Sequence, residues 1–149
     1  PDVLAAFAAG TPVSLRNPGA IRPWQHVLEP LSGYLALAQR LADEGAAWAD
    51  AWNFGPHEAD ARTVTWVVDR LARGWGPDAR WTTAIEALPH EAHTLKLDCS
   101  KAHSRLGWQP RWNADTAIAR SLAWHQAWRS GADMQRYTLD EIAAFGSSS

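Results

Sequence analysis

The sequence predicts one α/β domain that is mostly helical and carries a few short strands. Its length of 149 residues is typical of one domain. Most segments repeat apolar side chains every three to four residues, and only short runs alternate apolar and polar side chains. Leu, Ile, Val and Phe are scarce, but ten tryptophans supply apolar area. We therefore expect a folded globular chain.

The N-terminal third contains two expected helices and one strand. An aspartate and a glycine enclose the apolar stretch at 2–10, which favours a short helix. Residues 12–16 alternate as in a strand, and Asn-Pro-Gly at 17–19 is typical of a turn. Residues 20–26 are predicted to form a loop. The apolar pattern at 27–44 predicts a long helix, which a proline in its first turn and a following glycine support.

The middle of the chain is expected to contain three short strands and one helix. The first strand is the apolar run 51–55. Thr63 is a suitable N-cap for the helix that follows, and Gly74 is expected to end it. Alternating side chains favour weaker strands at 80–83 and 94–98.

The C-terminal third is predicted to be helical. Asp98 or Ser100 can cap a short helix that ends at Gly107. Asn113 or Asp115 can cap a long helix that follows it.

The two ends of the chain suggest a piece of a longer protein. The sequence starts at Pro1 without an initiator methionine. A last short helix is expected at 138–145, and the small polar residues 146–149 are expected to form a disordered tail.

Charge and cysteine content exclude several classes of protein. The net charge of −2 gives no attraction to nucleic acid or to an anionic membrane, so neither is an expected partner. No apolar stretch is long enough for a membrane span, and no leader is recognisable. The single cysteine, Cys99, has no disulfide partner in the chain, which is compatible with the cytoplasm. We expect it to be a small buried hydrophobe.

The sequence lacks the usual catalytic motifs. It contains no Gly-x-Gly-x-x-Gly loop, no Tyr-x-x-x-Lys pair and no Gly-x-Ser-x-Gly turn. His90 and His93 stand three residues apart, whereas a metalloprotease helix places its two histidines four apart, so we expect no metal site. These histidines and Glu91 could bind a polar ligand or lie in a solvated loop. We predict no catalytic residue in this chain.

Arg22 is the strongest candidate for a binding residue. It lies in the predicted loop beside Trp24 and His26, and a fixed guanidinium binds phosphate or carboxylate through two parallel hydrogen bonds. A surface arginine without a ligand is an equally good interpretation from sequence alone. Trp24 could stack on a sugar. The other tryptophans, including Trp66, Trp108, Trp112, Trp124 and Trp128, are expected to fill the core.

Three strings of residues resemble the C-terminal part of extended short-chain dehydrogenase/reductases that act on sugar nucleotides. They are Ile-Arg-Pro-Trp-Gln-His-Val at 21–27, Trp-Asn-Phe-Gly at 52–55, and Leu-Asp-Cys-Ser-Lys at 97–101 continuing to Leu-Gly-Trp-Gln-Pro at 106–110. The similarity covers nearly the whole chain. Within that superfamily, the strings at 22–31 and 89–101 resemble the CDP-glucose 4,6-dehydratases. The resemblance implies a mostly helical substrate-binding lobe of a Rossmann-type enzyme.

The resemblance also implies substrate contacts. Arg22 matches an arginine that binds the substrate diphosphate. Relatives that bind dTDP-sugars carry a second arginine where this chain has Leu88, so the second phosphate contact is open. The remaining candidates match segments near the nucleotide or could replace that arginine: Leu15, Arg16, Asn17, Arg62, His90, Glu91 and His93.

In enzymes of this family, NAD takes hydride from C4 of the glucose, water leaves across C5 and C6, and hydride returns to C6. The residues for this chemistry and for NAD belong to an N-terminal half. We therefore expect this chain to be inert alone and not to bind NAD.

Residues 49–83 are expected to pack on the missing dinucleotide-binding domain, and self-association could cover that surface. A CDP-sugar is the expected ligand, a homo-oligomer the expected assembly and the cytoplasm the expected location. The alternatives are a non-catalytic sugar or nucleotide-binding module and a structural domain without a ligand.

Overall fold

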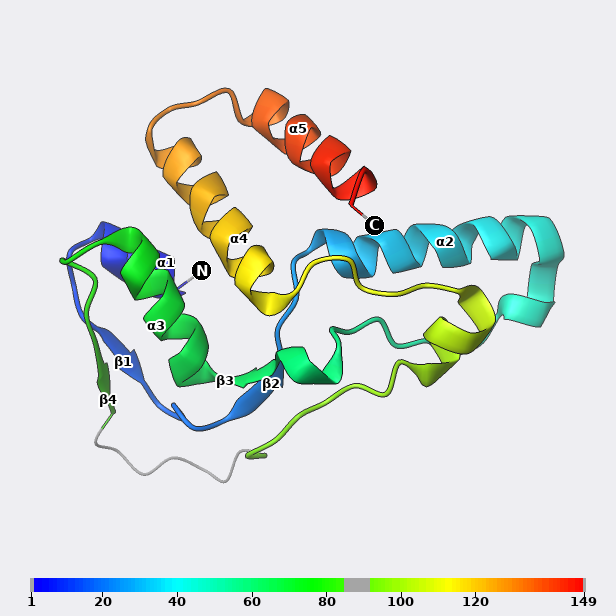
Figure 1. Ribbon diagram of the computed structural model, residues 1–149, viewed down its shortest axis with the longest axis horizontal. Helices are drawn as coiled ribbons and strands as arrows, with labels where there is room; N and C mark the ends of the chain where they lie inside the picture. The colour runs from blue at the N-terminus through cyan, green and yellow to red at the C-terminus, as the bar shows by residue number, and fades with distance from the viewer. Residues whose placement is uncertain (1, 85–91, 149) are drawn as a thin grey trace.

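The computed structural model describes residues 2–84 and 92–148. Within these residues, five α-helices and four three-residue strands fold into a mixed α/β structure, as predicted (Figure 1). The helices and strands are α1 (Asp2–Ala8), β1 (Val13–Leu15), β2 (Ile21–Pro23), α2 (Leu28–Glu44), β3 (Ala61–Thr63), α3 (Val64–Trp75), β4 (Trp81–Thr83), α4 (Ala114–Arg129) and α5 (Met134–Gly146). Short 3-10 turns span Gly45–Trp48 and Glu58–Asp60, and a π-helical turn spans Ala102–Leu106.

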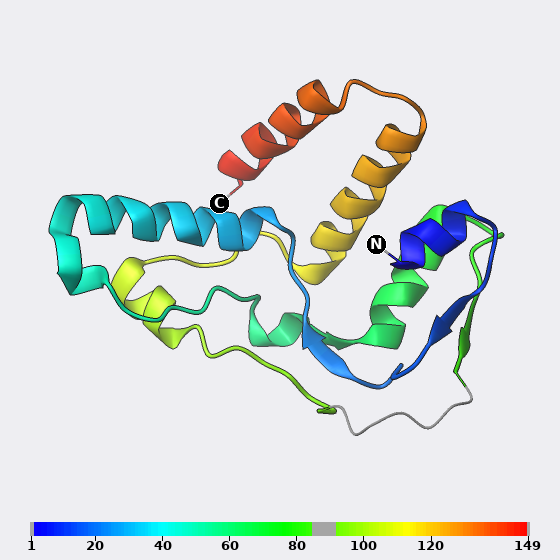
Figure 2. The same cartoon turned by 180° about the vertical axis from the view of Figure 1, so that it is seen from behind.

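The strands form two separate pairs. β1 pairs with β4 in parallel, and β2 pairs with β3 in antiparallel orientation. Figure 2 shows the two pairs at the same side of the molecule, with α4 and α5 projecting from the other. None of the helices in the described part of the chain combines the length and apolar character that a membrane crossing requires.

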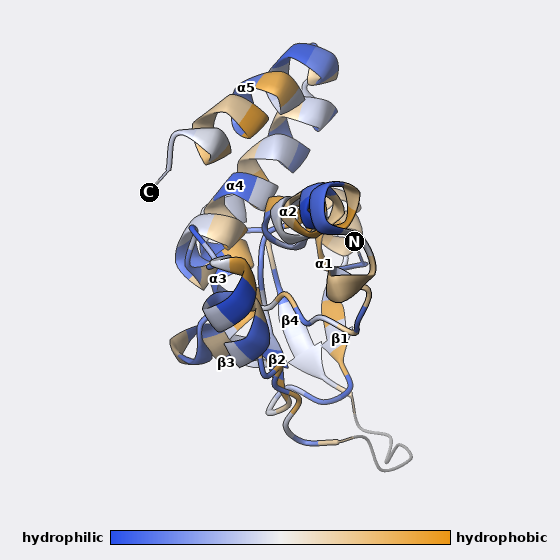
Figure 3. Ribbon diagram, turned by 90° about the vertical axis from the view of Figure 1, so that its right-hand side faces the viewer, coloured by the Kyte–Doolittle hydropathy of each residue, from blue (hydrophilic) through white to orange (hydrophobic). Residues whose placement is uncertain are grey.

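Two small clusters make up the core. One packs α1 and α3 on β1 and is built around Phe7, Leu15 and Val68. Figure 3 shows the hydrophobic β1 beside the paler β4. The second packs Phe54 against Trp108 below α2. Trp108 and Trp112, which the sequence predicted to fill the core, are both more than nine-tenths buried.

Three local predictions about strands were wrong. Residues 20–26 contain β2, because β3 supplies its hydrogen-bond partners on one side and Thr94 forms a bridge on the other. Residues 51–55 form no strand. The carbonyl oxygen of Phe54 accepts a hydrogen bond from Gln25 Nε2 instead of from a neighbouring strand. Residues 94–98 contribute only the bridge at Thr94.

The predicted helix ends also need correction. Gly74 lies inside α3, where its missing side chain leaves room for Leu122 of α4, and α3 ends before Gly76, which has a positive φ of 128°. Thr63 and Asn113 cap α3 and α4 as predicted. The last helix starts before residue 138, because Asp133 caps it.

Two tryptophans of α4 are not core residues. Trp124 is 37% exposed and Trp128 is 55% exposed, since α4 packs on α3 along one side and meets α5 only in part. The indole of Trp124 still donates a hydrogen bond to Thr138 of α5, at 3.1 Å.

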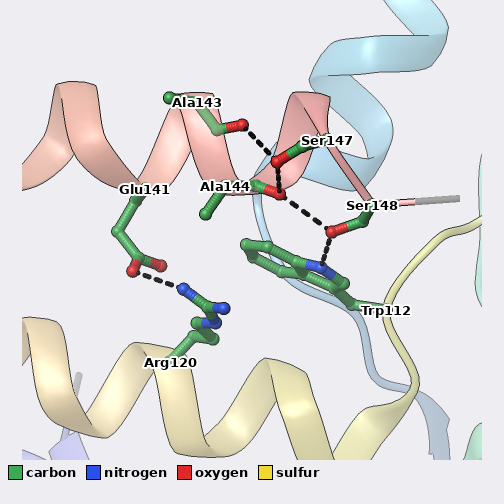
Figure 4. A network of polar contacts seen from close by, with 7 residues as sticks. All are labelled: Trp112, Arg120, Glu141, Ala143, Ala144, Ser147 and Ser148. Carbon is green, nitrogen blue, oxygen red and sulfur yellow. Dashed lines mark hydrogen bonds and ion pairs between the residues drawn. The ribbon is translucent and has the colours of Figure 1, made fainter.

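Side chains from both helices hold α5 on α4 (Figure 4). Arg120 of α4 forms an ion pair with Glu141 of α5, with 2.8 Å between Nη1 and Oε1. Trp112 donates from Nε1 to the hydroxyl of Ser148 at 2.8 Å. Gly146 closes α5 and Ser147 also forms hydrogen bonds, so residues 146–148 differ from the disordered tail that the sequence predicts.

Glu29 in the first turn of α2 is the most deeply buried charged side chain of the described residues. Its carboxylate accepts the backbone N–H groups of Arg111 and Trp112, at 3.1 Å and 2.7 Å. Burial raises the pKa of Glu29, and these hydrogen bonds oppose the rise. Asp60 accepts the N–H of Ala114 in the same way, at 2.9 Å. Two acidic side chains therefore fix the segment that leads into α4.

Replacing Glu29 should destabilise the chain. Glu29→Ala leaves two backbone N–H groups without acceptors, of which that of Trp112 is buried, and this should lower the free energy of unfolding by about 2–5 kcal/mol. Urea denaturation would measure the change. Glu58→Ala is the control, because the side chain of Glu58 is 82% exposed and solvent screens its ion pair, so this change should affect stability little. Equal stability of the two variants would contradict this role of Glu29.

His26 should make stability depend on pH. Its Nδ1 accepts the N–H of Leu28 at 3.3 Å, and its ring packs edge-on against Trp112. Burial lowers the pKa of His26, an effect that Arg120 reinforces and Glu141 opposes. The unfolded chain therefore binds a proton more readily, so stability should fall as pH drops below about 6.5.

His26→Gln should reduce the slope of unfolding free energy against pH in this range, and denaturation at several pH values would measure it. His93→Gln serves as the control, because His93 is exposed. An unchanged slope in His26→Gln would show that His26 does not contribute.

Candidate functional site

The antiparallel ladder of β2 and β3 brings two of the predicted binding residues together. Arg22 of β2 lies directly opposite Arg62 of β3. Directly opposed residues of a ladder point to the same face, where two like charges repel each other. Such a pair is favourable when an anion lies between the guanidinium groups or beside them. The register therefore brings two of the predicted binding residues together on one face of the ladder.

The segment after residue 91 lies along the other side of β2. The N–H of Ile21 donates to the carbonyl oxygen of His93 at 2.8 Å. The guanidinium of Arg22 donates from Nη1 to the carbonyl oxygens of Ala92, at 3.1 Å, and of Ile21, at 2.9 Å. These bonds hold Arg22 against the segment that carries His93. His93 Cε1 lies 3.5 Å from the position that a Cβ on Gly19 would take.

Arg62 is exposed, and aromatic neighbours hold its strand and side chain. Its guanidinium carbon lies 5.1 Å from the centre of the Trp66 ring. Its carbonyl oxygen accepts a hydrogen bond from the indole of Trp24 at 2.9 Å. Trp24 therefore fixes β3, and its polar edge is directed at the protein rather than at solvent.

The other predicted binding residues differ in their exposure and in their position relative to this pair. The side chain of Leu15 is buried in the core cluster with Val68, so only its backbone is available to a ligand. Arg16 is exposed. Asn17 begins the turn before β2, where its carbonyl oxygen accepts the N–H of Ala20. His90 and Glu91 lie outside the described residues.

A polar cavity of about 480 Å³ begins one step along the ladder, at Pro23 and Ala61. Successive side chains of a strand point to opposite faces, so the arginine pair borders this cavity and does not line it. Polar side chains from three segments complete the wall: His57, Glu58, Lys96, Asp98, Ser100 and His103. The sequence predicted no ligand role for these residues. Their joint position depends on contacts between segments about forty residues apart, which no local pattern encodes.

The chemistry of the cavity suits binding better than covalent catalysis. Glu58 and Lys96 form an ion pair at 2.7 Å on its rim. Cys99 is buried as predicted, and burial raises the pKa of its thiol, which disfavours the nucleophilic thiolate. Hydrogen bonds from Ser100 lower the pKa of Asp98, so this carboxyl remains ionised. Nε2 of His103 is buried without a hydrogen-bond partner among the described residues.

The described residues contain no site of the usual form for a nicotinamide dinucleotide. Phosphates of such cofactors bind at a glycine-rich turn between a strand and a helix, and no Gly-x-Gly-x-x-Gly occurs in the sequence. The loop of a dinucleotide fold would follow a strand of a larger parallel sheet, whereas the sheets that the structure describes have two strands each. Within residues 2–84 and 92–148, no three His, Cys, Asp or Glu side chains are grouped to hold a metal ion.

Comparison with known proteins identifies one close relative. The chain is 52% identical over 145 residues, 97% of its length, to CDP-glucose 4,6-dehydratase of Salmonella typhimurium. It spans 40% of the length of that relative, which is consistent with the predicted C-terminal portion. No family model matches the chain. The resemblance to CDP-glucose 4,6-dehydratases that the sequence predicted is therefore confirmed.

Proposed function

We propose that this chain is the substrate-binding portion of an NAD-dependent CDP-glucose 4,6-dehydratase. The intact enzyme would be a lyase that converts CDP-glucose to CDP-4-keto-6-deoxyglucose and water. The observation that carries the proposal is the opposed pair Arg22 and Arg62, in a chain that is 52% identical to an enzyme of that name.

A nucleoside diphosphate-sugar matches the arginine pair in charge. Its diphosphate carries two negative charges at neutral pH, and guanidinium groups bind phosphate oxygens through paired hydrogen bonds. The register of β2 and β3 places Arg22 and Arg62 on one face, where both can contact one diphosphate. His93, which hydrogen-bonds through its backbone to β2, can supply the further contact left open by Leu88.

We place the nucleotide end of the substrate near the turn before β2. Arg16 and Asn17 can contact the base or ribose there, with the backbone of Leu15. The buried side chain of Leu15 supports the position of β1 and leaves the contact to main-chain atoms.

The NAD site and the catalytic residues would belong to the rest of a longer protein. Residues 49–83 would pack on that dinucleotide-binding domain, giving a Rossmann-type lobe arrangement. Outside that range, Val27 just before α2 and Leu35 on α2 are 62% and 72% exposed, and self-association would cover these apolar side chains. We further propose a cytoplasmic homo-oligomer without nucleic-acid or membrane partners.

A non-catalytic sugar or nucleotide-binding module is the second candidate. It is favoured by a polar cavity beside the arginine pair in a chain without a Tyr-x-x-x-Lys pair. A Gly-rich loop and that pair upstream in the parent gene would support the enzyme, and their absence would support the module.

Calorimetric titration should detect CDP-glucose binding to the purified chain. Arg62→Gln should weaken the affinity at least tenfold, because it removes one of the two guanidinium groups proposed to bind the diphosphate. Arg73→Gln is the matched control, since Arg73 is an exposed arginine at the end of α3. CMP, which lacks the diphosphate, should bind more weakly than CDP. Equal affinity of both variants for CDP-glucose would contradict the proposed anion site.

The chain alone should not turn over CDP-glucose when NAD is added. The reason is that it carries neither the cofactor loop nor the acid/base pair. Absorbance of the 4-keto sugar product in alkali would measure turnover, and the intact Salmonella typhimurium enzyme in the same assay is the positive control. Product formation by this chain above the no-enzyme background would contradict the assignment of the catalytic residues to another part of the protein.

A further inference from the structure

The first turn of α3 brings an indole ring to the arginine pair. β3 ends at Thr63 and α3 begins at Val64, so Trp66 follows Arg62 by four residues. The hydroxyl of Thr63 accepts the backbone N–H of Trp66 at 3.1 Å, which fixes this turn. The guanidinium carbon of Arg62 lies 5.1 Å from the centre of the Trp66 ring, within the range of a cation–π contact.

A second arginine holds the same ring. The guanidinium carbon of Arg70, one helical turn after Trp66, lies 3.5 Å from the centre of the ring. Arg70 also forms an ion pair with Asp115 in the first turn of α4. This ion pair compensates the charge of Arg70, so the contact fixes the ring and adds little net positive charge beside Arg62.

The hydrogen-bond donors of Arg62 remain available to a ligand. Among the residues that the structure describes, none accepts a hydrogen bond or forms an ion pair with the side chain of Arg62. A cation–π contact is an attraction between a charge and the face of a ring, so it does not require the N–H groups as donors. The guanidinium of Arg62 is therefore held by Trp66 while its N–H groups are free for an anion.

We propose that Trp66 is a positioning residue of the anion site, which holds the guanidinium of Arg62 where the substrate diphosphate binds. This inference rests on the proposed function and extends it to a residue that acts through Arg62. Binding restricts a long, exposed side chain, and the lost freedom lowers affinity. A ring that restricts the side chain beforehand removes part of that loss.

Replacement of Trp66 should weaken ligand binding moderately. In calorimetric titration with CDP-glucose, Trp66→Leu should raise the dissociation constant about fivefold, because the side chain of Arg62 becomes free to move. Trp66→Phe keeps an aromatic face and should bind nearly as well as the original chain. Trp128→Leu is the matched control, because Trp128 is 55% exposed on α4, where its ring packs on His125.

Two further measurements separate positioning from a general loss of structure. In a chain that already carries Arg62→Gln, Trp66→Leu should not weaken binding further, because its effect passes through Arg62. A purely structural effect would weaken binding in both backgrounds. Nuclear magnetic resonance gives the second readout, since an aromatic face shifts the resonances of protons above it upfield. Trp66→Leu should therefore move the side-chain proton resonances of Arg62 downfield.

Urea denaturation of each variant would establish that it is folded. The proposal is overturned if Trp66→Leu binds as the original chain does, if Trp66→Phe or Trp128→Leu loses as much affinity, or if Arg62→Gln does not abolish the effect. Unchanged Arg62 resonances in Trp66→Leu would also overturn it. Full affinity of Arg62→Gln alone would instead contradict the anion site itself, so the two failures are distinguishable.

Discussion

The register of β2 and β3 is the constraint on which the candidate site depends. A shift by one residue would turn Arg22 and Arg62 to opposite faces and separate their charges. Several contacts outside the ladder maintain the register. The Trp24 indole binds the Arg62 carbonyl oxygen, and the backbone of His93 binds Ile21 on the other side of β2. These packing and hydrogen-bonding interactions hold Arg22 and Arg62 opposite each other, as the proposed site requires.

Buried carboxylates connect this site to the helical part of the molecule. β2 leads within a few residues into α2, whose Glu29 binds the backbone at Arg111 and Trp112. Asp60, which immediately precedes β3, binds the N–H of Ala114. Both arginine-bearing strands are therefore fixed to the segment that precedes α4. Displacement of that segment would disturb both strands, so the stability of the helical part and the geometry of the anion site are coupled.

Local sequence patterns predicted the helices well. They failed where contacts between residues far apart in the sequence determine the structure. Thr63 and Asn113 could be recognised as caps because capping depends on neighbouring residues. Gly74 could not be placed inside α3, because its role is to admit Leu122 from another helix. Arg22 and Arg62 were both selected from sequence, but their opposition follows from the pairing of β2 with β3. The wall of the polar cavity likewise depends on segments that meet only in the folded chain.

The central claim is that Arg22 and Arg62 bind one anion together. Nuclear magnetic resonance of the two arginine Nε–H groups during a titration with CDP tests it most directly. We expect both resonances to shift with the same dissociation constant, since one diphosphate contacts both guanidinium groups. Shifts of neither resonance, or of the two with different dissociation constants, would contradict the account.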